Sequence, residues 1–260
     1  MDLGRVDVVL VRATRPANVG AACRALKNMG LRSLVLVGGA EGLDQPEVRA
    51  LAHGAWDVLD GAARRATLRE AVAPATLVAG TSGRRHPEAW APRRLAVEAD
   101  ARTAGGRLAL VFGPESSGLS DDELALCHVR VHVPADPAHP SLNLAQAVLL
   151  VAYELRLAAL AGNPAAADSA RAAARATAGE VEGALDDLRR GLLGIGYLNP
   201  ANPEAILSEL RALITRAGPT AREVALLRGL ARQVAWAASR IAPPPGGTDN
   251  PGSTPGEEGR

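Results

Sequence analysis

Residues 6–37, VDVVLVRATRPANVGAACRALKNMGLRSLVLV, decide the fold class. The stretch opens with the β-branched run Val6–Val11, continues with apolar residues at helical spacing over Ala17–Met29, and closes with a second β-branched run, Ser33–Val37. Short apolar runs that alternate with helical patterns are typical of βα units, in which the helix carries the chain back so that the strands pair in parallel. The sequence therefore predicts an α/β fold with a mostly parallel sheet and helices on both of its faces.

The alternation continues to about residue 160, so we expect residues 1–160 to form one domain. Capping boxes, in which a Ser or Thr is followed three residues later by Glu, mark two short helices, at Thr67–Glu70 and Ser120–Glu123. The other predicted elements are a helix over 46–51, strands over 57–59, 76–79, 107–112 and 129–133, a loop with one weak helix over 84–106, and a helix over 143–160.

The remainder of the chain changes character. Residues 161–180 are rich in alanine and predict a linker, and three amphipathic patterns over 181–241 predict a small helical domain. These patterns are Val181–Leu193, Pro203–Arg216 behind Asn202 as N-cap, and Thr220–Ile241 behind a third capping box. Residues 242–260 carry too little apolar surface to offset chain entropy, so we expect a disordered tail.

Composition limits the classes of protein. Aromatic residues make up only 2%, which argues against a stacking platform for bases, and the net charge of +1 leaves only local basic patches for nucleic acid. The two cysteines allow at most one disulfide, and no signal-like start precedes the first strand, so we expect a reduced, cytoplasmic protein. Gln146, Glu154 and Arg156 interrupt the longest apolar stretch, which predicts that no segment spans a membrane.

Ligands of doubly wound sheets bind at the carboxyl ends of the strands, and small residues follow three strands there. The loops are 80–83 (GTSG), 113–118 (GPESSG) and 134–143, which ends in Ser141-Leu142-Asn143. Each glycine loop alone is more often a simple turn. Three together indicate one pocket in which backbone groups contact the ligand. A P-loop is excluded because Leu119 and Ser120 stand where a phosphate-binding loop has Lys and Ser or Thr.

The turn after the first strand is a second candidate site. It contains Asn18, and Arg24 and Lys27 follow on one face of the helix, although a surface arginine is by itself more often just solvated. Cys127, His128 and His132 do not predict a metal site, since zinc takes four ligands from two clusters and strand alternation separates the cysteine from the histidines. No Ser-His-Asp triple is favoured either.

The motifs taken together resemble those of the SPOUT superfamily of RNA methyltransferases, of the TrmH and TrmJ type. The resemblance rests on the opening stretch quoted above and on LVAGTSGR, LVFGPESSGLSDDEL and VHVPADPAHPSLNLAQAVLLVAYELR, and it covers about residues 5–160. The later segments DDLRRGLLGIGYLNP and ILSELRALITRAGPTAREVALLRGL are similar, more loosely, to the C-terminal extension of the TrmJ type. One departure is Pro114, where the family often has a polar residue.

The resemblance implies a trefoil knot formed by the 143–160 helix, a homodimer whose sites use residues of both subunits, and S-adenosyl-L-methionine as the cofactor. It implies methylation of an RNA ribose 2′-hydroxyl, with tRNA at the anticodon loop as the expected substrate and no metal. The residues that would hold the cofactor are Thr81, Ser82, Gly83, Gly113, Val133, Ser141, Leu142 and Asn143, and those that would surround the ribose as catalytic residues are Asn18, Arg24, Glu115 and Asn143.

Arg24 has the catalytic position of the family. Because a guanidinium stays protonated in almost any protein, we expect it to stabilise the developing alkoxide rather than to remove the proton. The C-terminal arginines Arg189, Arg190, Arg211, Arg216, Arg222 and Arg228 are expected to contribute to RNA recognition. Two alternatives stay open: methylation of ribosomal RNA or of another tRNA ribose, and an RNA-binding protein that has lost catalysis.

Overall fold

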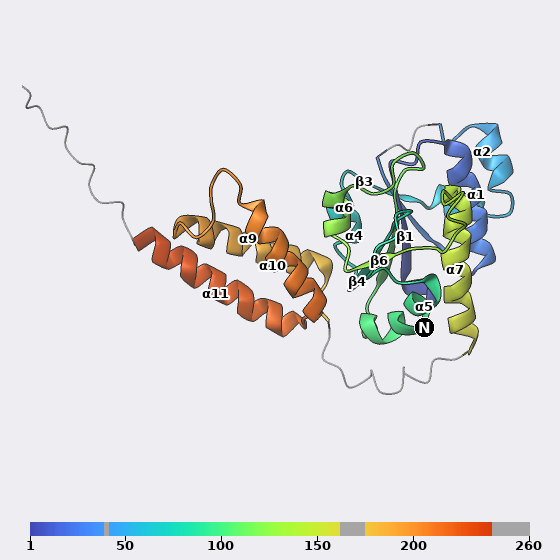
Figure 1. Cartoon of the computed structure of the whole chain (residues 1–260). Coiled ribbons are helices and arrows are strands. Elements are labelled where there is room, and N and C mark those ends of the chain that lie inside the picture. Colours follow the sequence, from blue (N-terminus) through green and yellow to red (C-terminus); the bar gives the residue numbers. More distant parts are fainter. Residues whose placement is uncertain (39–41, 162–174, 241–260) are drawn as a thin grey trace, which may run out of the picture.

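The computed structural model describes residues 1–38, 42–161 and 175–240, which form a parallel sheet covered by helices and, beside it, a bundle of three helices (Figure 1). The predictions for the middle of the linker and for the 242–260 tail lie outside the described residues.

The sheet has six strands in the order β3-β2-β1-β5-β4-β6, and every neighbouring pair is parallel. This confirms the predicted α/β class. The central strands are buried because helices cover both faces, and the burial of β1 and β5 is unbroken along their length, whereas the edge strand β3 is largely exposed. The strand bounds are β1 Val6–Val11, β2 Ser33–Val37, β3 Ala63–Arg65, β4 Leu77–Thr81, β5 Leu108–Phe112 and β6 Val129–Val131.

Alternate residues of the strands enter two separate cores. Val8 and Leu10 of β1 join the core on one face, and Val9 and Val11 join the core on the other. The larger core packs under α1 (Pro16–Asn28), α2 (Pro46–Leu51), α3 (Trp56–Asp60), α5 (Pro92–Thr103) and α7 (Leu144–Ala161), after a short 3-10 turn at Leu3–Arg5. The smaller core packs under α4 (Leu68–Val72) and α6 (Asp121–Ala125), on the opposite side of the sheet in Figure 1.

The prediction of a strand over 57–59 is wrong. These residues lie in helix α3, and the strand is formed further on, by Ala63–Arg65. Ala55, Val58 and Leu59 are buried at positions i, i+3 and i+4, which is the spacing of a helix face rather than of a strand. The segment is too short for that pattern to stand out in the sequence.

The bundle consists of α9 (Ala178–Gly194), α10 (Glu204–Ala217) and α11 (Ala221–Arg240). Helix α9 begins three residues before its predicted start, behind a capping box of Thr177 and Glu180. The prediction of Asn202 as N-cap of α10 is wrong: Pro203 is the cap, without a side-chain hydrogen bond, and the Asn202 N–H donates to Asn199 O in the preceding turn. The capping box at Thr220 and Glu223 is present.

The start of α9 joins the bundle to the sheet domain. The backbone N–H groups of Ala178 and Gly179 donate to the carbonyls of Ala75 (2.7 Å) and Ala73 (3.0 Å), and Arg69 pairs with Asp186 at 2.7 Å. Ala178 is buried in the smaller sheet core. The two parts are therefore in direct contact at the amino-terminal end of α9.

Helix α7 has 18 residues with a mean hydropathy of 1.6, so by length and composition it could cross a membrane, contrary to the expectation from sequence. In the structure it packs against α1 and α5, and Val148, Val151 and Leu155 are buried in the larger core. The helix nevertheless exposes five large apolar side chains: Leu149, Leu150, Tyr153, Leu157 and Leu160.

Trp90 connects the edge of the sheet to α5. Its backbone makes two hydrogen bonds to the chain at β6: the Trp90 N–H donates to Arg130 O, and Trp90 O accepts from the His132 N–H. Its ring is buried, and the guanidinium groups of Arg94 and Arg102 lie 4.4 and 4.8 Å from its centroid. Cation–π contacts thus fix α5 against the strand that lines the site described next.

Candidate active site

A pocket of about 740 Å³ opens at the carboxyl ends of β4, β5 and β6, where Thr81, Phe112 and Val131 lie. All three predicted loops reach it. Seven of the eight residues predicted to hold a cofactor line this pocket: Thr81, Ser82, Gly83, Gly113, Val133, Ser141 and Leu142. The eighth, Asn143, lies next to them in sequence at the start of α7 but is not a lining residue.

Glycines let the loops approach closely. A Cβ on Gly113 would lie 2.3 Å from the carbonyl carbon of Gly118 and 2.4 Å from the backbone nitrogen of Leu119, so only glycine lets the two ends of the 113–118 loop meet. A Cβ on Gly80 would lie 2.5 Å from the Cys127 sulfur. A Cβ on Gly83 would meet no protein atom within 4 Å, so the space beside Gly83 is open.

The pocket combines an apolar wall with polar loops. Phe112, Leu119, Leu124 and Val131 contribute apolar surface, while Ser116 and Ser141 make no side-chain hydrogen bond with the described residues. Thr81 and Ser82 use their hydroxyls to shape the loop, since they donate to Val111 O and Arg84 O at 3.0 and 3.1 Å. Such a site can hold a planar ring against apolar side chains and bind polar groups through the loops.

Three of the four predicted catalytic residues form one hydrogen-bonded network at the rim. Glu115 accepts hydrogen bonds from the side-chain amide of Asn18 and from the hydroxyl of Thr14 (2.7 Å). The amide of Asn143 donates to Asn18 Oδ1 at 2.9 Å, and Asn143 Oδ1 accepts from the N–H of Ala145 (2.9 Å) in the first turn of α7. The network therefore joins the β1–α1 turn, the loop after β5 and the start of α7.

Glu115 is ionised in this network. Partial burial opposes ionisation, but the hydrogen bonds from Asn18 and Thr14 outweigh it and hold the pKa of Glu115 below its ordinary value. A carboxylate with this many donors is a fixed acceptor, so Glu115 can orient Asn18 but is a poor proton acceptor at neutral pH.

Arg24 is not part of this network. It is exposed on α1, six residues beyond Asn18, and it forms no hydrogen bond or ion pair with any described residue. It does not line the pocket either. Within one chain, therefore, the structure brings Asn18, Glu115 and Asn143 together and leaves Arg24 apart.

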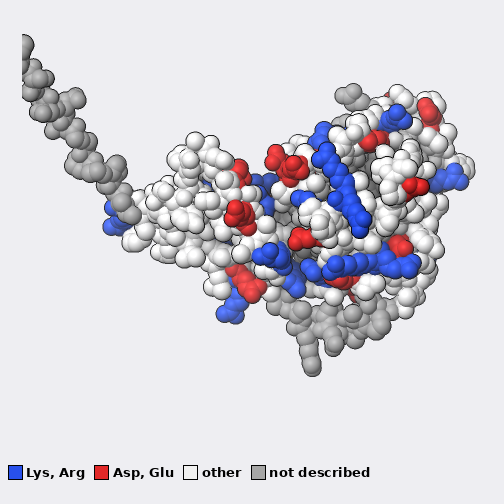
Figure 2. All heavy atoms as spheres, viewed as in Figure 1, with Lys and Arg blue, Asp and Glu red and all other residues white. Residues whose placement is uncertain are grey.

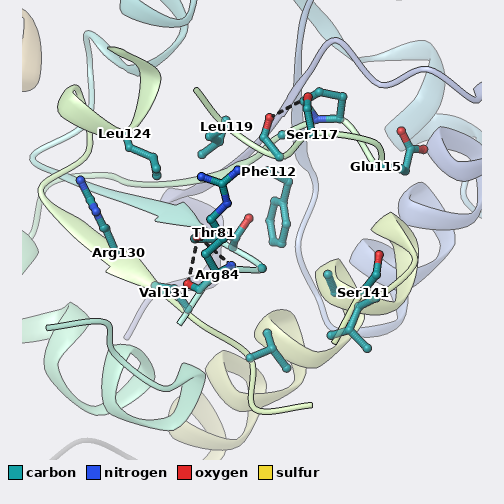
Figure 3. A pocket seen from close by; sticks show the side chains of 18 of the residues that line it. Thr81, Arg84, Phe112, Glu115, Ser117, Leu119, Leu124, Arg130, Val131 and Ser141 are labelled. Atoms are coloured by element: carbon teal, nitrogen blue, oxygen red, sulfur yellow. Dashed lines mark hydrogen bonds between the residues drawn. The ribbon is translucent and has the colours of Figure 1, made fainter. Parts of the chain in front are cut away.

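Sequence reasoning missed several residues at the site. Thr14 was not singled out, although a hydroxyl just before a helix start often makes local hydrogen bonds. Arg12 forms a two-bond ion pair with Glu123 of the α6 capping box, and this pair connects the end of β1 to the pocket loop. The backbone of Arg12 has a positive φ of 46°. Arg84, Arg85, His86 and Arg130 also line the pocket. In Figure 3, Arg84 lies centrally, with Glu115 and Arg130 at opposite edges.

The Cys127 region has a structural role. Burial raises the pKa of the Cys127 thiol to about 12, and the sulfur donates to Glu123 O at 3.3 Å. His128 accepts from the Val78 N–H at 3.3 Å, and His132 Nδ1 lies 3.0 Å from Ser82 O. Within the described ranges, no three His, Cys, Asp or Glu side chains group as metal ligands would. Cys23 and Cys127 are both free.

A parallel sheet with a glycine-lined pocket at the carboxyl ends of its strands defines an α/β protein that binds its ligand at this edge of the sheet. Comparison with known proteins narrows the class. Residues 5–153 match the SpoU rRNA Methylase family, and residues 179–242 match the C-terminal domain of the tRNA methyltransferase TrmJ.

Individual relatives agree with these matches. The chain is 41% identical over 239 residues to a tRNA (cytidine/uridine/adenosine-2′-O-)-methyltransferase TrmJ of Pseudomonas aeruginosa, covering 88% of this chain and 93% of that protein. It is 39% identical over 233 residues to a tRNA (cytidine/uridine-2′-O-)-methyltransferase TrmJ of Klebsiella pneumoniae, covering 88% and 95%. The crystal structure of TrmJ from Z. mobilis superposes with a TM-score of 0.76 at 33% identity, covering 88% of this chain and 98% of that chain. The chain therefore belongs to the SpoU methylase family, in the group that carries a TrmJ C-terminal domain, as the sequence motifs predicted.

Proposed function

We propose that this protein is an S-adenosyl-L-methionine-dependent methyltransferase that acts on a ribose 2′-hydroxyl of tRNA, in the anticodon loop. The observation that carries the proposal is the convergence of the three predicted loops on one pocket, with the Asn18–Glu115–Asn143 network at its rim. The relatives at 36–41% identity are named tRNA 2′-O-methyltransferases, and this chain spans at least 90% of their length. A tRNA substrate also favours a cytoplasmic location.

The pocket fits the proposed cofactor. Its volume and its apolar wall of Phe112, Leu119 and Val131 suit an adenosine, and the glycine loops leave backbone groups accessible to the adenine edge and the ribose. The open space beside Gly83 and the unused hydroxyl of Ser141 add room and a polar contact. We propose that Thr81, Ser82, Gly83, Gly113, Val133, Ser141, Leu142 and Asn143 hold it.

The residues at the rim have distinct proposed roles. The cofactor, when bound, supplies an activated methyl group, so the protein must place the 2′-oxygen and help it lose its proton. Asn18, oriented by Glu115 and Asn143, would hold the substrate ribose. The guanidinium of Arg24 would stabilise the negative charge that develops on the 2′-oxygen as its proton passes to solvent or to a phosphate.

Arg24 does not line the pocket of its own chain, so we propose that it has this role in a dimer. We propose that two copies pair through α1 and the exposed apolar face of α7, which pack side by side, so that Arg24 of one subunit reaches the pocket of the other. An exposed row of Leu149, Leu150, Tyr153 and Leu157 on one helix face is typical of a surface that a partner covers.

We further propose that the chain forms the trefoil knot of its superfamily. Helix α7 follows β6 at the edge of the sheet, yet it packs on α1 and α5. The segment between β6 and α7 must therefore cross the carboxyl ends of the strands beside the pocket loops, where passage through a loop would produce the knot.

The test uses the purified full-length chain with labelled S-adenosyl-L-methionine and total RNA, followed by mapping of ribose methylation through resistance to alkaline cleavage. We expect cofactor binding by calorimetry and one methylated ribose in the anticodon loop of tRNA. Methylation of ribosomal RNA alone would show that the substrate is misassigned. Cofactor binding without methylation of any RNA would favour a chain that has lost catalysis.

A further inference from the structure

A second cavity, of about 290 Å³, lies at the opposite end of the sheet from the pocket described above. Thr76 and Leu77, at the start of β4, form its floor on the sheet side. The C-terminal end of α10, the 175–176 segment and Val181 of α9 form its other side. The cavity therefore lies between the sheet domain and the helical bundle, away from the proposed methyl-transfer site.

Its lining is basic. Arg102 of α5, Arg175 and Arg216 of α10 all line it, and no Asp or Glu is among its lining residues. Burial lowers the pKa of His128, the remaining titratable lining residue, to about 4, so this histidine is neutral at pH 7. Figure 2 shows both basic and acidic side chains where the bundle meets the sheet domain, while the bundle surface away from the junction is largely uncharged on this face.

The three arginines differ in the hydrogen bonds and ion pairs that they make. Arg102 pairs with Glu98 at 3.4 Å, and Arg175 donates to the carbonyl of Gly218. Arg216 is exposed and makes no hydrogen bond or ion pair with any described residue, and the hydroxyl of Thr215 beside it makes no hydrogen bond with the described residues either. The cavity thus contains unused donors that favour an anion.

Four other arginines of the bundle pair with carboxylates. Arg190 and Arg228 pair with the buried carboxylate of Asp187, Arg211 pairs with the buried Glu182, and Arg189 pairs with Glu204. Of the six bundle arginines expected to contact RNA, only Arg216 and Arg222 therefore have no acidic partner among the described residues. Arg232 of α11, which is not one of these six, is exposed and does not line this cavity, so it serves as the comparison.

A purely structural role explains part of this arrangement. Helix α10 ends at Ala217 with Gly218 in the left-handed conformation, and cations near a helix C-terminus compensate its unsatisfied carbonyls. That accounts for the bond from Arg175 to Gly218. The same role covers Arg216, in the last turn of α10, and Arg102, in the last turn of α5, pairs with Glu98 and stacks on Trp90. A structural role does not account for an open cavity that is lined by arginines from both parts of the molecule.

We propose that this cavity binds a backbone phosphate of the RNA substrate, at a site distinct from the methyl-transfer pocket and bridging the two parts of the chain. The proposal rests on the proposed function, since it takes RNA as the source of the phosphate. The planar guanidinium groups match phosphate oxygens in a two-bond geometry, and they reach the cavity from both sides. RNA bound here is held by the sheet domain and the bundle together.

The test measures tRNA binding by the full-length chain as a function of salt, for the wild type, Arg216→Ala, and Arg232→Ala as the matched control. Removing one phosphate contact lowers the slope of log Kd against log salt by about 0.7–0.9. We expect that loss for Arg216→Ala, with affinity at moderate salt reduced about 5- to 10-fold because the contact is charge-assisted but partly solvated. Arg232→Ala is expected to behave as wild type, and the melting temperature and cofactor affinity of both variants should be unchanged.

Identical salt slopes for Arg216→Ala and Arg232→Ala would overturn the proposal while wild-type methylation of tRNA stands. A second measurement uses inorganic phosphate as the probe. If it raises the melting temperature of the wild type but not of Arg216→Ala, and tRNA binding by the two is equal, the site serves a free anion and the RNA assignment is wrong. If the wild type neither binds nor methylates tRNA, both the proposed function and this phosphate site are wrong.

Discussion

Glu115 and Arg24 were both predicted from the same family pattern, but the structure places them in opposite surroundings. Glu115 accepts hydrogen bonds from Thr14 and Asn18, whereas Arg24 is exposed without a partner among the described residues. The first residue therefore contributes to the stability of the isolated chain, and the second contributes nothing measurable until a substrate or a second subunit is present.

Substitution of Arg24 separates a surface role from a catalytic one. For Arg24→Ala we expect stability to change by no more than about 0.5 kcal/mol, because no contact is lost. Turnover on tRNA should fall about 100-fold or more, the scale for one preorganised charge at a developing oxyanion. Arg24→Lys should be nearly as poor, since lysine lacks the planar fork. Arg32→Ala, at another exposed arginine, is the control. Wild-type turnover by Arg24→Ala, in a single-turnover assay, would contradict the assignment.

Glu115 predicts a pH dependence of stability. The pKa of Glu115 is lowered in the folded protein. Its contribution to the free energy of unfolding is therefore present above the pKa of a glutamate in the unfolded chain, about 4.3, and is lost as the pH falls through the folded pKa. Glu115→Gln should therefore unfold at lower urea concentration than wild type at pH 7, and the difference should shrink as the pH is lowered below about 4. Glu88→Gln, at an exposed carboxylate, is the control. A difference that is independent of pH would contradict this explanation.

At the level of elements, the loop after β5 depends on one glycine. A Cβ on Gly113 would collide with backbone at Gly118 and Leu119, so the backbone of Gly113→Ala must shift. We expect a loss of about 1–3 kcal/mol in unfolding free energy, the usual cost of overpacking, together with weaker cofactor binding by calorimetry. A Cβ on Gly229 of α11 would meet no atom within 4 Å, so Gly229→Ala should instead raise the unfolding free energy by about 0.5–1 kcal/mol. Normal stability and cofactor affinity of Gly113→Ala would refute the close approach.

The elements also show what sequence could and could not predict. The runs Val6–Val11 and Ser33–Val37 match β1 and β2 residue for residue, because strands buried on both faces need continuous apolar stretches. The pocket loops were found because glycine and serine follow three strands. The 57–59 segment was misassigned because five residues are too few to reveal a period. The strand order and the cavity at Arg216 depend on contacts between distant segments, which local patterns do not encode.

At the scale of the whole molecule, the outer face of α7 predicts the oligomeric state. Tyr153 is 47% exposed among three leucines, and Tyr153→Glu would place a charge in the proposed dimer interface. We expect light scattering to give a dimer for the wild type and a monomer for Tyr153→Glu, with methylation lost because Arg24 cannot reach the partner's pocket. Leu226→Glu, at a leucine of α11 that is 66% exposed, should stay dimeric and active. A monomeric, active wild type would exclude the shared site.

The position of Trp90 gives the protein an internal optical reporter. Trp56 and Trp236 are exposed, so the emission of the buried Trp90 should lie at shorter wavelength and be separable from theirs. Its backbone bonds to the strand that lines the large pocket, and its ring lies under Arg102, which lines the basic cavity. Occupation of either site changes the charge or the packing around one indole, so fluorescence titrations could follow cofactor and RNA separately, on the same unlabelled chain.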